Sequence, residues 1–140
     1  MRSTLTDPFH TRLTVQVGDL NYGNHLSNDA VLRLVHETRI RWLAAQGYSE
    51  LDCGNGAGLI MVEAHVRYLA QAFHGDELNC CQTACRAGRS GLVLHSTLTR
   101  EADRTPIAEA RCTLRFFDYR AQRIARPPQA FLALDSAPTA

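Results

Sequence analysis

The sequence predicts an α+β fold in which a five-stranded antiparallel sheet wraps around one long central helix. A single segment, residues 28–46, repeats its apolar side chains with a helical period. Residues 10–18 and four segments after residue 57 instead alternate apolar and polar side chains, as strands do. Short turn-forming loops join the last four segments, which is typical of antiparallel neighbours. One apolar stripe cannot cover a flat sheet of five strands, so we expect the sheet to curve around the helix.

The first strand is expected at residues 10–18, where Leu13, Val15 and Val17 share one face and polar residues occupy the other. The segment 18–25 that follows reads Gly-Asp-Leu-Asn-Tyr-Gly-Asn-His and is rich in residues that form irregular turns. We expect this loop to lead directly into the helix.

The helix is expected to begin at Asn28. Its apolar stripe is made of Val31, Leu34, Val35, Thr38 and Trp42. Ser27 or Asn28 is expected to cap the first turn, and the Asp29 carboxylate complements the positive end of the helix dipole. Gly47 is expected just beyond the last turn, where glycine is the preferred residue. The helix is then about 19 residues and ~28 Å long.

After a loop at residues 48–57, the remaining elements are expected to be strands separated by turn signals. The four predicted strands are 58–72, 77–87, 92–100 and 106–117. The strand at 58–72 is long and rather apolar, with Val62, Ala64, Val66 and Tyr68 on one face. Its free edge is a natural place for pairing with a second copy of the chain, so we expect a homodimer or a homotetramer.

Length and composition indicate one globular domain. The chain has 140 residues, of which 45% are hydrophobic and 21% are charged, ordinary values for a soluble protein. No repeat, low-complexity tract or linker divides the sequence, so residues 1–140 are expected to form one domain with an ordered core at 8–134. The first seven residues and the tail after Leu134 are small, polar or proline-containing, and we expect them to fray.

Charge and cysteine content narrow the possible partners. The net charge of +1 gives no electrostatic footprint for nucleic acid or an anionic membrane. No apolar run approaches the ~18–20 residues that cross a bilayer. The first ten residues are too polar for a signal peptide, so a cytoplasmic location is expected. The five cysteines include no Cys-x-x-Cys pair, which favours buried reduced thiols over a metal site.

Two motifs carry a resemblance to a known family. Residues 17–28 read Val-Gly-Asp-Leu-Asn-Tyr-Gly-Asn-His-Leu-Ser-Asn. This segment resembles the Gly-Asp-x-Asp-x-x-Gly-His-Val-Asn-Asn pattern of hotdog-fold acyl-CoA thioesterases, and more closely their 4-hydroxybenzoyl-CoA thioesterase group. Residues 68–76 read Tyr-Leu-Ala-Gln-Ala-Phe-His-Gly-Asp and resemble the family's Tyr-x-x-Pro-x-x-x-Gly-Asp turn. The family's Glu-x-x-Arg is echoed, with shorter spacing, by Glu37 and Arg39.

The resemblance covers residues 10–118 in order and spacing. It implies a hotdog fold, a substrate site at a dimer interface, and hydrolysis of acyl-CoA to free acid and CoA. It implies no metal and no organic cofactor.

The sequence departs from the family at the catalytic carboxylate, which is the second Asp of Gly-Asp-x-Asp. This position is Asn21, and an amide cannot take a proton from water as a carboxylate does. Either Asn21 only orients water or the thioester, or hydrolysis has been lost. The nearby carboxylates available to replace the missing one belong to Asp19, Asp29, Glu37 and Glu63.

Glu63 is the first choice among these carboxylates as the base. Asp19 is explained as a turn residue, Asp29 by the helix dipole and Glu37 by an ion pair with a neighbouring arginine. Glu63 instead lies in an apolar stretch, where partial burial would suit it to activating water across a dimer interface. The alternative for Glu63 is a solvated position on the outer face of the sheet.

The remaining site residues follow from the loop and the start of the helix. His25 occupies the position of the family's histidine and is expected to orient the thioester or polarise water, with a packing role as the alternative. Tyr22, Gly23, Asn24 and Asn28 are expected to contact the substrate. A helix that starts directly after this loop points free N–H groups at the pocket, where they would polarise a thioester carbonyl.

Two other functions stay open at this point. A non-catalytic module that binds acyl-CoA or acyl-carrier protein is favoured by the replacement of the carboxylate with Asn21. A hotdog hydratase or dehydratase would need a histidine and a carboxylate placed for proton transfer. No Gly-x-Ser-x-Gly sequence is present, which disfavours serine-hydrolase chemistry.

Overall fold

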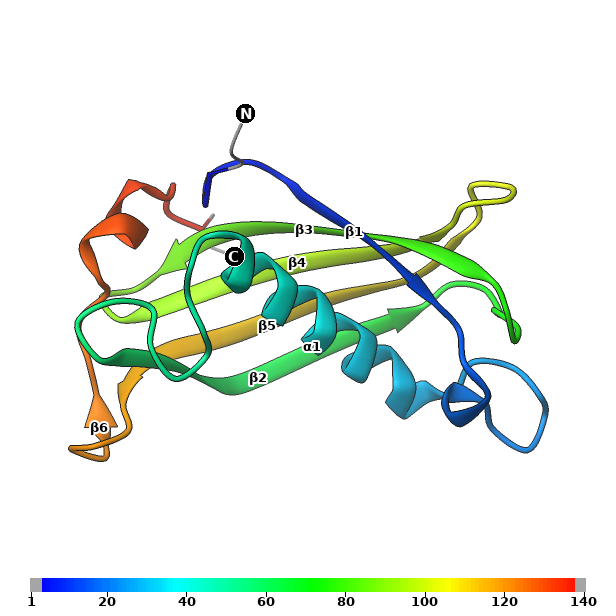
Figure 1. Ribbon diagram of the computed structural model, residues 1–140, viewed down its shortest axis with the longest axis horizontal. Coiled ribbons are helices and arrows are strands. Elements are labelled where there is room, and N and C mark those ends of the chain that lie inside the picture. The colour runs from blue at the N-terminus through cyan, green and yellow to red at the C-terminus, as the bar shows by residue number, and fades with distance from the viewer. Residues whose placement is uncertain (1–3, 138–140) are drawn as a thin grey trace.

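The fold consists of one long helix held in the hollow of a curved antiparallel sheet (Figure 1). A computed structural model describes residues 4–137. The helix is α1 (Asn28–Ala45), and two short 3-10 turns are η1 (Val17–Asp19) and η2 (Gln129–Ala133). The strands are β1 (Phe9–Thr14), β2 (Ala57–Tyr68), β3 (Glu77–Ala87), β4 (Gly91–Arg100), β5 (Pro106–Asp118) and β6 (Arg123–Ile124).

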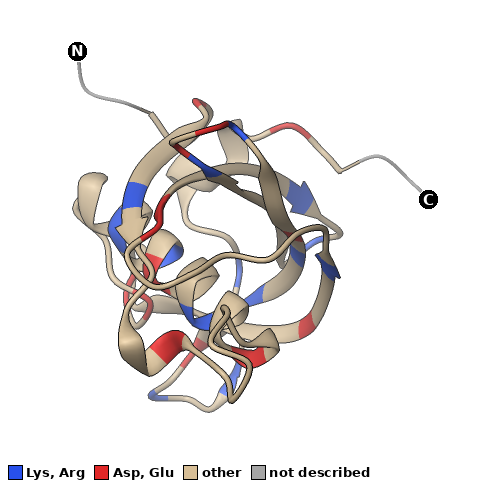
Figure 2. Ribbon diagram, turned by 90° about the vertical axis from the view of Figure 1, so that its right-hand side faces the viewer, with Lys and Arg blue, Asp and Glu red and all other residues tan. Residues whose placement is uncertain are grey.

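The strand order in the sheet is β1-β3-β4-β5-β2, with β6 also paired to β5. A view along the long axis shows the strands curving around α1, with charged residues of both signs spread over the surface (Figure 2). The predicted α+β hotdog architecture is confirmed. The expected count of five strands is wrong by one, because a tight turn after β5 returns the chain as the two-residue strand β6. The carboxylate of Asp118 holds this turn by accepting the N–H groups of Arg120 and Ala121.

The helix begins at the predicted residue, ends one residue earlier than predicted, and buries the predicted stripe. It is 18 residues long, and Val31, Val35 and Trp42 are almost completely buried. Ser27 occupies the N-cap position, but its hydroxyl donates to the Asp29 carboxylate and accepts no backbone N–H of the first turn. Gly47 lies beyond the last turn with a φ of 82°, a left-handed conformation that favours glycine.

The first strand is shorter than the predicted 10–18. It ends at Thr14, and Val17 lies in η1 with 74% of its surface exposed rather than on the buried face with Val15. The cause is a local hydrogen bond: the Asp19 carboxylate accepts the N–H of Gln16 at 2.8 Å and closes a turn. Such side-chain bonds compete with strand pairing.

The strand β2 lies at one edge of the sheet and ends earlier than the predicted residue 72. Beyond Tyr68 the N–H groups of Leu69 and Ala70 both donate to the carbonyl of Ile107, which bends the chain out of the ladder. The pairing register with β5 shifts between Met61 and Glu63, so the strand contains a bulge. Its second edge has no partner strand in the described part of the chain.

The core lies between α1 and the concave face of the sheet. At its far end Phe131 of η2 makes ring contacts with Trp42, Tyr48 and Phe116 and closes the core beside the end of the helix. Leu5 also packs into the core, outside the expected limits of 8–134. The fraying expected at residues 1–3 and 138–140 falls on positions outside the described residues.

No helix in residues 4–137 combines the length and the apolar character that crossing a membrane would require.

Candidate active site

The loop between η1 and α1 folds back on itself. The carbonyl of Asn21 accepts the N–H of Asn24 at 3.0 Å, and the N–H of Asn21 donates to the carbonyl of His25 at 2.9 Å. Asn24 has a φ of 62°, a left-handed conformation that asparagine tolerates better than most residues. The resulting tight turn places residues 21 and 25 side by side just before the helix.

The side chains of Asn21 and His25 face each other within this turn. The Asn21 Oδ1 accepts the N–H of Gly23 at 2.8 Å, which fixes the amide with its Nδ2 toward His25. Asn21 Nδ2 lies 3.4 Å from His25 Nδ1, and the Leu26 carbonyl lies at the same distance from that ring nitrogen. Both side chains are half-buried. The sequence therefore predicted correctly that these two residues come from one loop, and the structure brings them together.

Gly23 leaves room for this pair. A Cβ atom at this position would lie 3.2 Å from His25 Nε2 and 3.3 Å from Asn21 Oδ1, closer than such contacts usually are. A larger residue would therefore displace the imidazole or the amide. Tyr22 and Asn24 flank Gly23 and are exposed at the tip of the turn.

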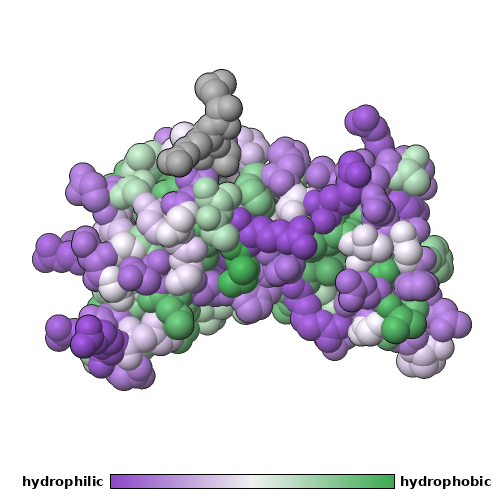
Figure 3. All heavy atoms as spheres, in the orientation of Figure 1, coloured by the Kyte–Doolittle hydropathy of each residue, from purple (hydrophilic) through white to green (hydrophobic). Residues whose placement is uncertain are grey.

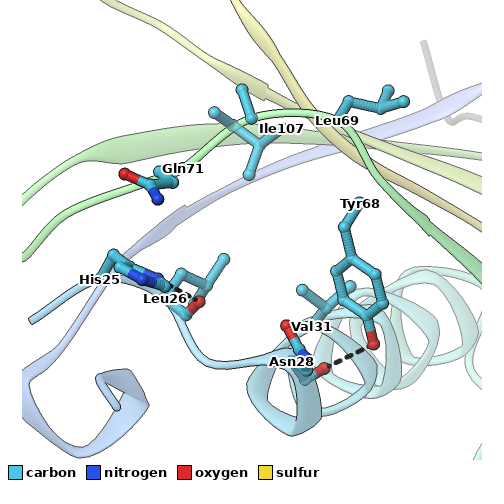
Figure 4. A pocket seen from close by; sticks show the side chains of 9 residues that line it. His25, Leu26, Asn28, Val31, Tyr68, Leu69, Gln71 and Ile107 are labelled. Carbon is cyan, nitrogen blue, oxygen red and sulfur yellow. Dashed lines mark hydrogen bonds between the residues drawn. The ribbon is translucent and has the colours of Figure 1, made fainter. Parts of the chain in front are cut away.

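A cavity of about 240 Å³ lies between this loop, the start of α1 and the end of β2 (Figure 4). Its lining includes His25, Asn28, Val31, Tyr68, Gln71 and Ile107. Most of its wall is apolar, and the imidazole and the phenol are its titratable groups. The face seen in Figure 3 shows green hydrophobic side chains at the bottom of a recess that hydrophilic side chains border. Asn21 lies behind His25 and does not line the cavity.

The start of α1 supplies polar groups to this cavity. Asn28 is the first helical residue, and its N–H has no acceptor within the helix. The Tyr68 hydroxyl donates to the Asn28 carbonyl at 3.1 Å and so ties the end of β2 to the first turn of the helix. On the solvent side, the Asp29 carboxylate covers part of the helix end. Its pKa is lowered chiefly by the hydrogen bond from the Ser27 hydroxyl, with smaller contributions from nearby backbone N–H groups and Arg33.

The structure does not bring Glu63 to this cavity. Glu63 pairs with Thr113 of β5, whereas the neighbouring β5 residues Cys112 and Leu114 are buried on the helix side. Since alternate strand residues point to opposite faces, the Glu63 carboxylate lies on the outer face of the sheet.

The other three candidate carboxylates are also engaged elsewhere. Asp19 accepts the Gln16 N–H and lies 3.6 Å from Arg33, and Glu37 lies 3.5 Å from Arg41. Asp29 sits on the solvent side of the helix end. Among residues 4–137 no carboxylate lines the cavity at the start of α1.

Tyr68 and Gln71 are lining residues to which sequence reasoning gave no role. Tyr68 shares the alternation of Ala64 and Val66, which places its ring on the helix side of β2. That signal was available in the sequence, but the contact with Asn28 needs the strand and the helix start to be placed together. Gln71 carries no such pattern.

Thiol and metal chemistry find no support in the described residues. Burial raises the pKa of Cys53 to about 12 and that of Cys80 to about 11, so neither forms a thiolate near neutral pH. No group of three or more His, Cys, Asp or Glu side chains within residues 4–137 is arranged to hold a metal ion.

Comparisons with known proteins agree with this geometry. Residues 15–134 match the thioesterase-like superfamily. No curated protein sequence is similar enough to count as a relative. Among solved structures, a 1,4-dihydroxy-2-naphthoyl-CoA thioesterase from Synechocystis superposes with a TM-score of 0.80 at 20% identity, over 94% of this chain and 100% of that one.

Two other solved structures share the fold. A hypothetical protein from Staphylococcus aureus, solved in complex with CoA, has a TM-score of 0.80 at 19% identity over 99% of this chain and 92% of that one. A 12:0-ACP thioesterase from Umbellularia californica has a TM-score of 0.74 at 12% identity, over 86% of this chain and 46% of that one. Identities this low establish the fold and leave the substrate open.

Proposed function

The chain belongs to the thioesterase-like superfamily, and on that premise we propose that it hydrolyses acyl-CoA thioesters to a free acid and CoA. One observation carries the proposal. The cavity at the start of α1 places an imidazole, a helix-end N–H and an apolar wall around one small volume, through His25, Asn28 and Val31. These are the groups that thioester hydrolysis needs: a base, a donor for the oxyanion and a surface for the acyl group.

The thioester carbonyl is positioned to accept the Asn28 N–H at the positive end of the helix dipole. Charge develops on this oxygen as water adds to the carbonyl carbon, and a preorganised donor is worth most at that moment. Tyr68 holds the same residue in place through its carbonyl. Tyr22, Gly23 and Asn24 do not line the cavity, and in this proposal they contact the part of the substrate that extends beyond it.

His25 is the base in this proposal. This role requires the tautomer with the proton on Nδ1, which faces the Leu26 carbonyl at 3.4 Å, so that Nε2 is free to take a proton from the attacking water. The water oxygen then bonds to the carbonyl carbon, the C–S bond breaks, and the proton passes from His25 to the departing CoA thiolate. Asn21 acts as a positioning residue, because its fixed amide packs against the imidazole.

Glu63 was expected to serve as the base, and the face on which it lies argues for His25 instead. Two variants distinguish Glu63 from His25 as the base. We expect Glu63→Gln to change kcat/KM by less than about twofold and His25→Ala to lower kcat by roughly 10²–10⁴-fold, the usual contribution of a general base. The reverse result would return the role to Glu63.

We also propose that the protein works as a homodimer paired through the free edge of β2. The edge strand exposes Ile60, Met61 and Val62 together with unpaired backbone groups, a combination that favours pairing with a second copy. An antiparallel pair of β2 strands would continue the sheet into the partner and roof the cavity beside Tyr68. A homotetramer built from two such dimers is the alternative, and sedimentation at several protein concentrations separates the two.

We also propose that the protein belongs to the 4-hydroxybenzoyl-CoA thioesterase group and that it is located in the cytoplasm. The motif at residues 17–28 and the structural neighbour that is itself a naphthoyl-CoA thioesterase support that group. The neighbour solved with CoA supports CoA as the carrier.

A second candidate function is the binding of acyl-CoA or acyl-carrier protein without turnover. It is favoured by Asn21, which stands where the resembling family has its catalytic carboxylate. The deciding experiment measures free thiol released from a panel of aliphatic and aromatic acyl-CoAs, beside equilibrium binding of the same compounds. Release that is lost in His25→Ala supports hydrolysis. Tight binding with no release would select the binding module.

A further inference from the structure

A second cavity lies farther along α1, between this helix and β2. It measures about 220 Å³, and its lining includes Arg33, Val35, His36, Arg39, Met61 and Cys112. Three of these side chains are basic, and no carboxylate lines the cavity. The proposed reaction uses none of these residues.

The guanidinium of Arg39 is the unusual group here. Only 6% of its side chain is exposed, yet arginine is rarely buried without full pairing. Its Nε lies 3.4 Å from Glu50 Oε2, without the alignment of a hydrogen bond. A guanidinium carries five N–H donors. Arg39 thus has a buried N–H donor, at Nε, that the ion pair with Glu50 does not satisfy.

Glu50 is a fixed carboxylate shared between two bases. Its Oε1 contacts His36 Nε2, and its Oε2 faces Arg39. The backbone holds it there, because the Leu59 N–H donates to the Glu50 carbonyl at 2.7 Å. A Cβ atom on Gly58 would lie 2.5 Å from that carbonyl oxygen, so only glycine allows the approach. One negative charge therefore serves both basic side chains.

The third base is already engaged. Arg33 lies 3.6 Å from Asp19 and 3.8 Å from Asp29, on the solvent side of the helix. The buried donor without a hydrogen-bond acceptor in this cavity therefore belongs to Arg39.

This cavity and the candidate active site are both lined by residues of α1 and β2. Residues 28 and 39 are separated by roughly 16 Å along the helix axis, and the Arg39 side chain leans toward the helix start. Apolar residues occupy both elements between these positions, including Val35 of α1 and Val66 of β2. An extended chain advances about 3.6 Å for every three bonds, so an acyl chain of about eight to twelve bonds would reach from the Asn28 N–H to the guanidinium.

We propose that Arg39 selects acyl-CoA substrates whose medium-length acyl chain ends in a carboxylate, with His36 beside it in the site for that terminal group. This inference rests on the proposed thioesterase function and names its substrate class. A carboxylate matches the fork of donors on a guanidinium and can accept the Arg39 N–H that Glu50 leaves without a hydrogen bond. A methyl end would leave the buried donors desolvated and unpaired, which is costly.

The test compares three acyl-CoAs of equal chain length, which are decanoyl-CoA, 10-hydroxydecanoyl-CoA and the mono-CoA thioester of decanedioic acid. Their non-hydrolysable thioether analogues supply dissociation constants that do not depend on turnover. We expect the carboxylate-ended compound to be preferred over decanoyl by about ten- to a hundredfold in kcat/KM and in affinity, the range of hydrogen bonds to charged groups.

Three variants sharpen the result. Arg39→Met should bring the preference close to one, and Arg41→Met, on the same helix but directed at Thr11 of β1, should leave it unchanged. Glu50→Gln should increase the preference, because it removes the competing carboxylate. The opposite signs of the Arg39 and Glu50 effects distinguish recognition from a general loss of structure, and Glu50→Gln keeps the test available if Arg39→Met fails to fold.

Equal treatment of the decanoyl and carboxylate-ended compounds by the unaltered protein would overturn the inference while leaving thioester hydrolysis intact. Equal preference for the hydroxyl-ended compound would overturn the assignment of a carboxylate. Failure to bind or hydrolyse any acyl-CoA would instead remove the proposed function itself.

Discussion

Asn21→Asp tests the assignment of the base most directly. The change restores a carboxylate at the position where the resembling family has one. The Gly23 N–H keeps its acceptor, and the second carboxylate oxygen replaces Nδ2 at 3.4 Å from His25 Nδ1. An anion at that position favours the protonated imidazole and accepts its Nδ1–H.

The size of the effect follows from the distance. Two unit charges at this separation interact by about 5 kcal/mol at an effective dielectric constant of about 20. Both side chains are half-exposed, so solvent screening reduces the interaction to roughly 1.4–2.8 kcal/mol, which corresponds to about one to two pH units. If His25 is the base, the acid limb of the kcat/KM profile should therefore move to higher pH by at least about one unit.

The assay is thiol release from one acyl-CoA between pH 4 and pH 9, measured for the unaltered protein and for Asn21→Asp. Asn55→Asp makes the same chemical change in a distant loop and should leave the profile in place. If the acid limb of the profile instead moves down to the pH range in which carboxylates titrate, the new Asp has become the base. A limb that does not move would show that His25 does not titrate in the reaction. Either outcome refutes the proposed role of His25.

Three further predictions concern the stability of the fold and the reactivity of two buried thiols. Tyr68→Phe removes the hydroxyl that donates to the first turn of α1 and should lower the free energy of unfolding by about 1 kcal/mol, measured by urea denaturation. A hydrogen bond from Arg100 lowers the pKa of Asp103 to about 2. The stability this carboxylate adds is present above its ordinary value of 3.8 and is lost as pH falls toward 2, so acid titration should erase the difference between Asp103→Asn and the unaltered protein in that window. Iodoacetamide at pH 8 should leave Cys53 and Cys80 unmodified in the folded protein, by mass spectrometry, because burial holds both thiols protonated.

Periodicity was sufficient to predict the element types. The helical stripe and the glycine at residue 47 gave α1 nearly its full length, and the strands β3, β4 and β5 have the predicted limits to within one residue at each end. These segments keep one period from end to end and are bounded by turn residues. Local pattern is then a faithful guide, because no competing interaction disturbs it.

The prediction failed where a side chain or a carbonyl competes with the strand ladder. Val17 fits the alternation of β1, but the Asp19 carboxylate captures the Gln16 N–H and turns the chain first. Residues 69–72 continue the apolar character of β2, but the Ile107 carbonyl draws two successive N–H groups out of register. The second case depends on a residue far along the chain, which no local pattern records.

The site residues divide in the same way. Asn21, Gly23 and His25 form a single tight turn, so their proximity follows from sequence separation alone. The pairing of Glu50 with His36 and Arg39 joins a loop to a helix, and it depends on the close approach that Gly58 permits. That approach belongs to the packing of the loop on β2 and is invisible in the linear pattern.

The position of Glu63 depends on one inserted residue. Leu59 and Met61 face the helix, and continued alternation would turn Glu63 the same way. The alternation of Ala64, Val66 and Tyr68, counted backwards, turns Glu63 outward instead. The two halves of β2 are thus out of phase, and the bulge between Met61 and Glu63 absorbs the difference. The sequence contains both phases and does not locate the step, so a catalytic carboxylate and a solvated one remained equally compatible with it until the register with β5 was known.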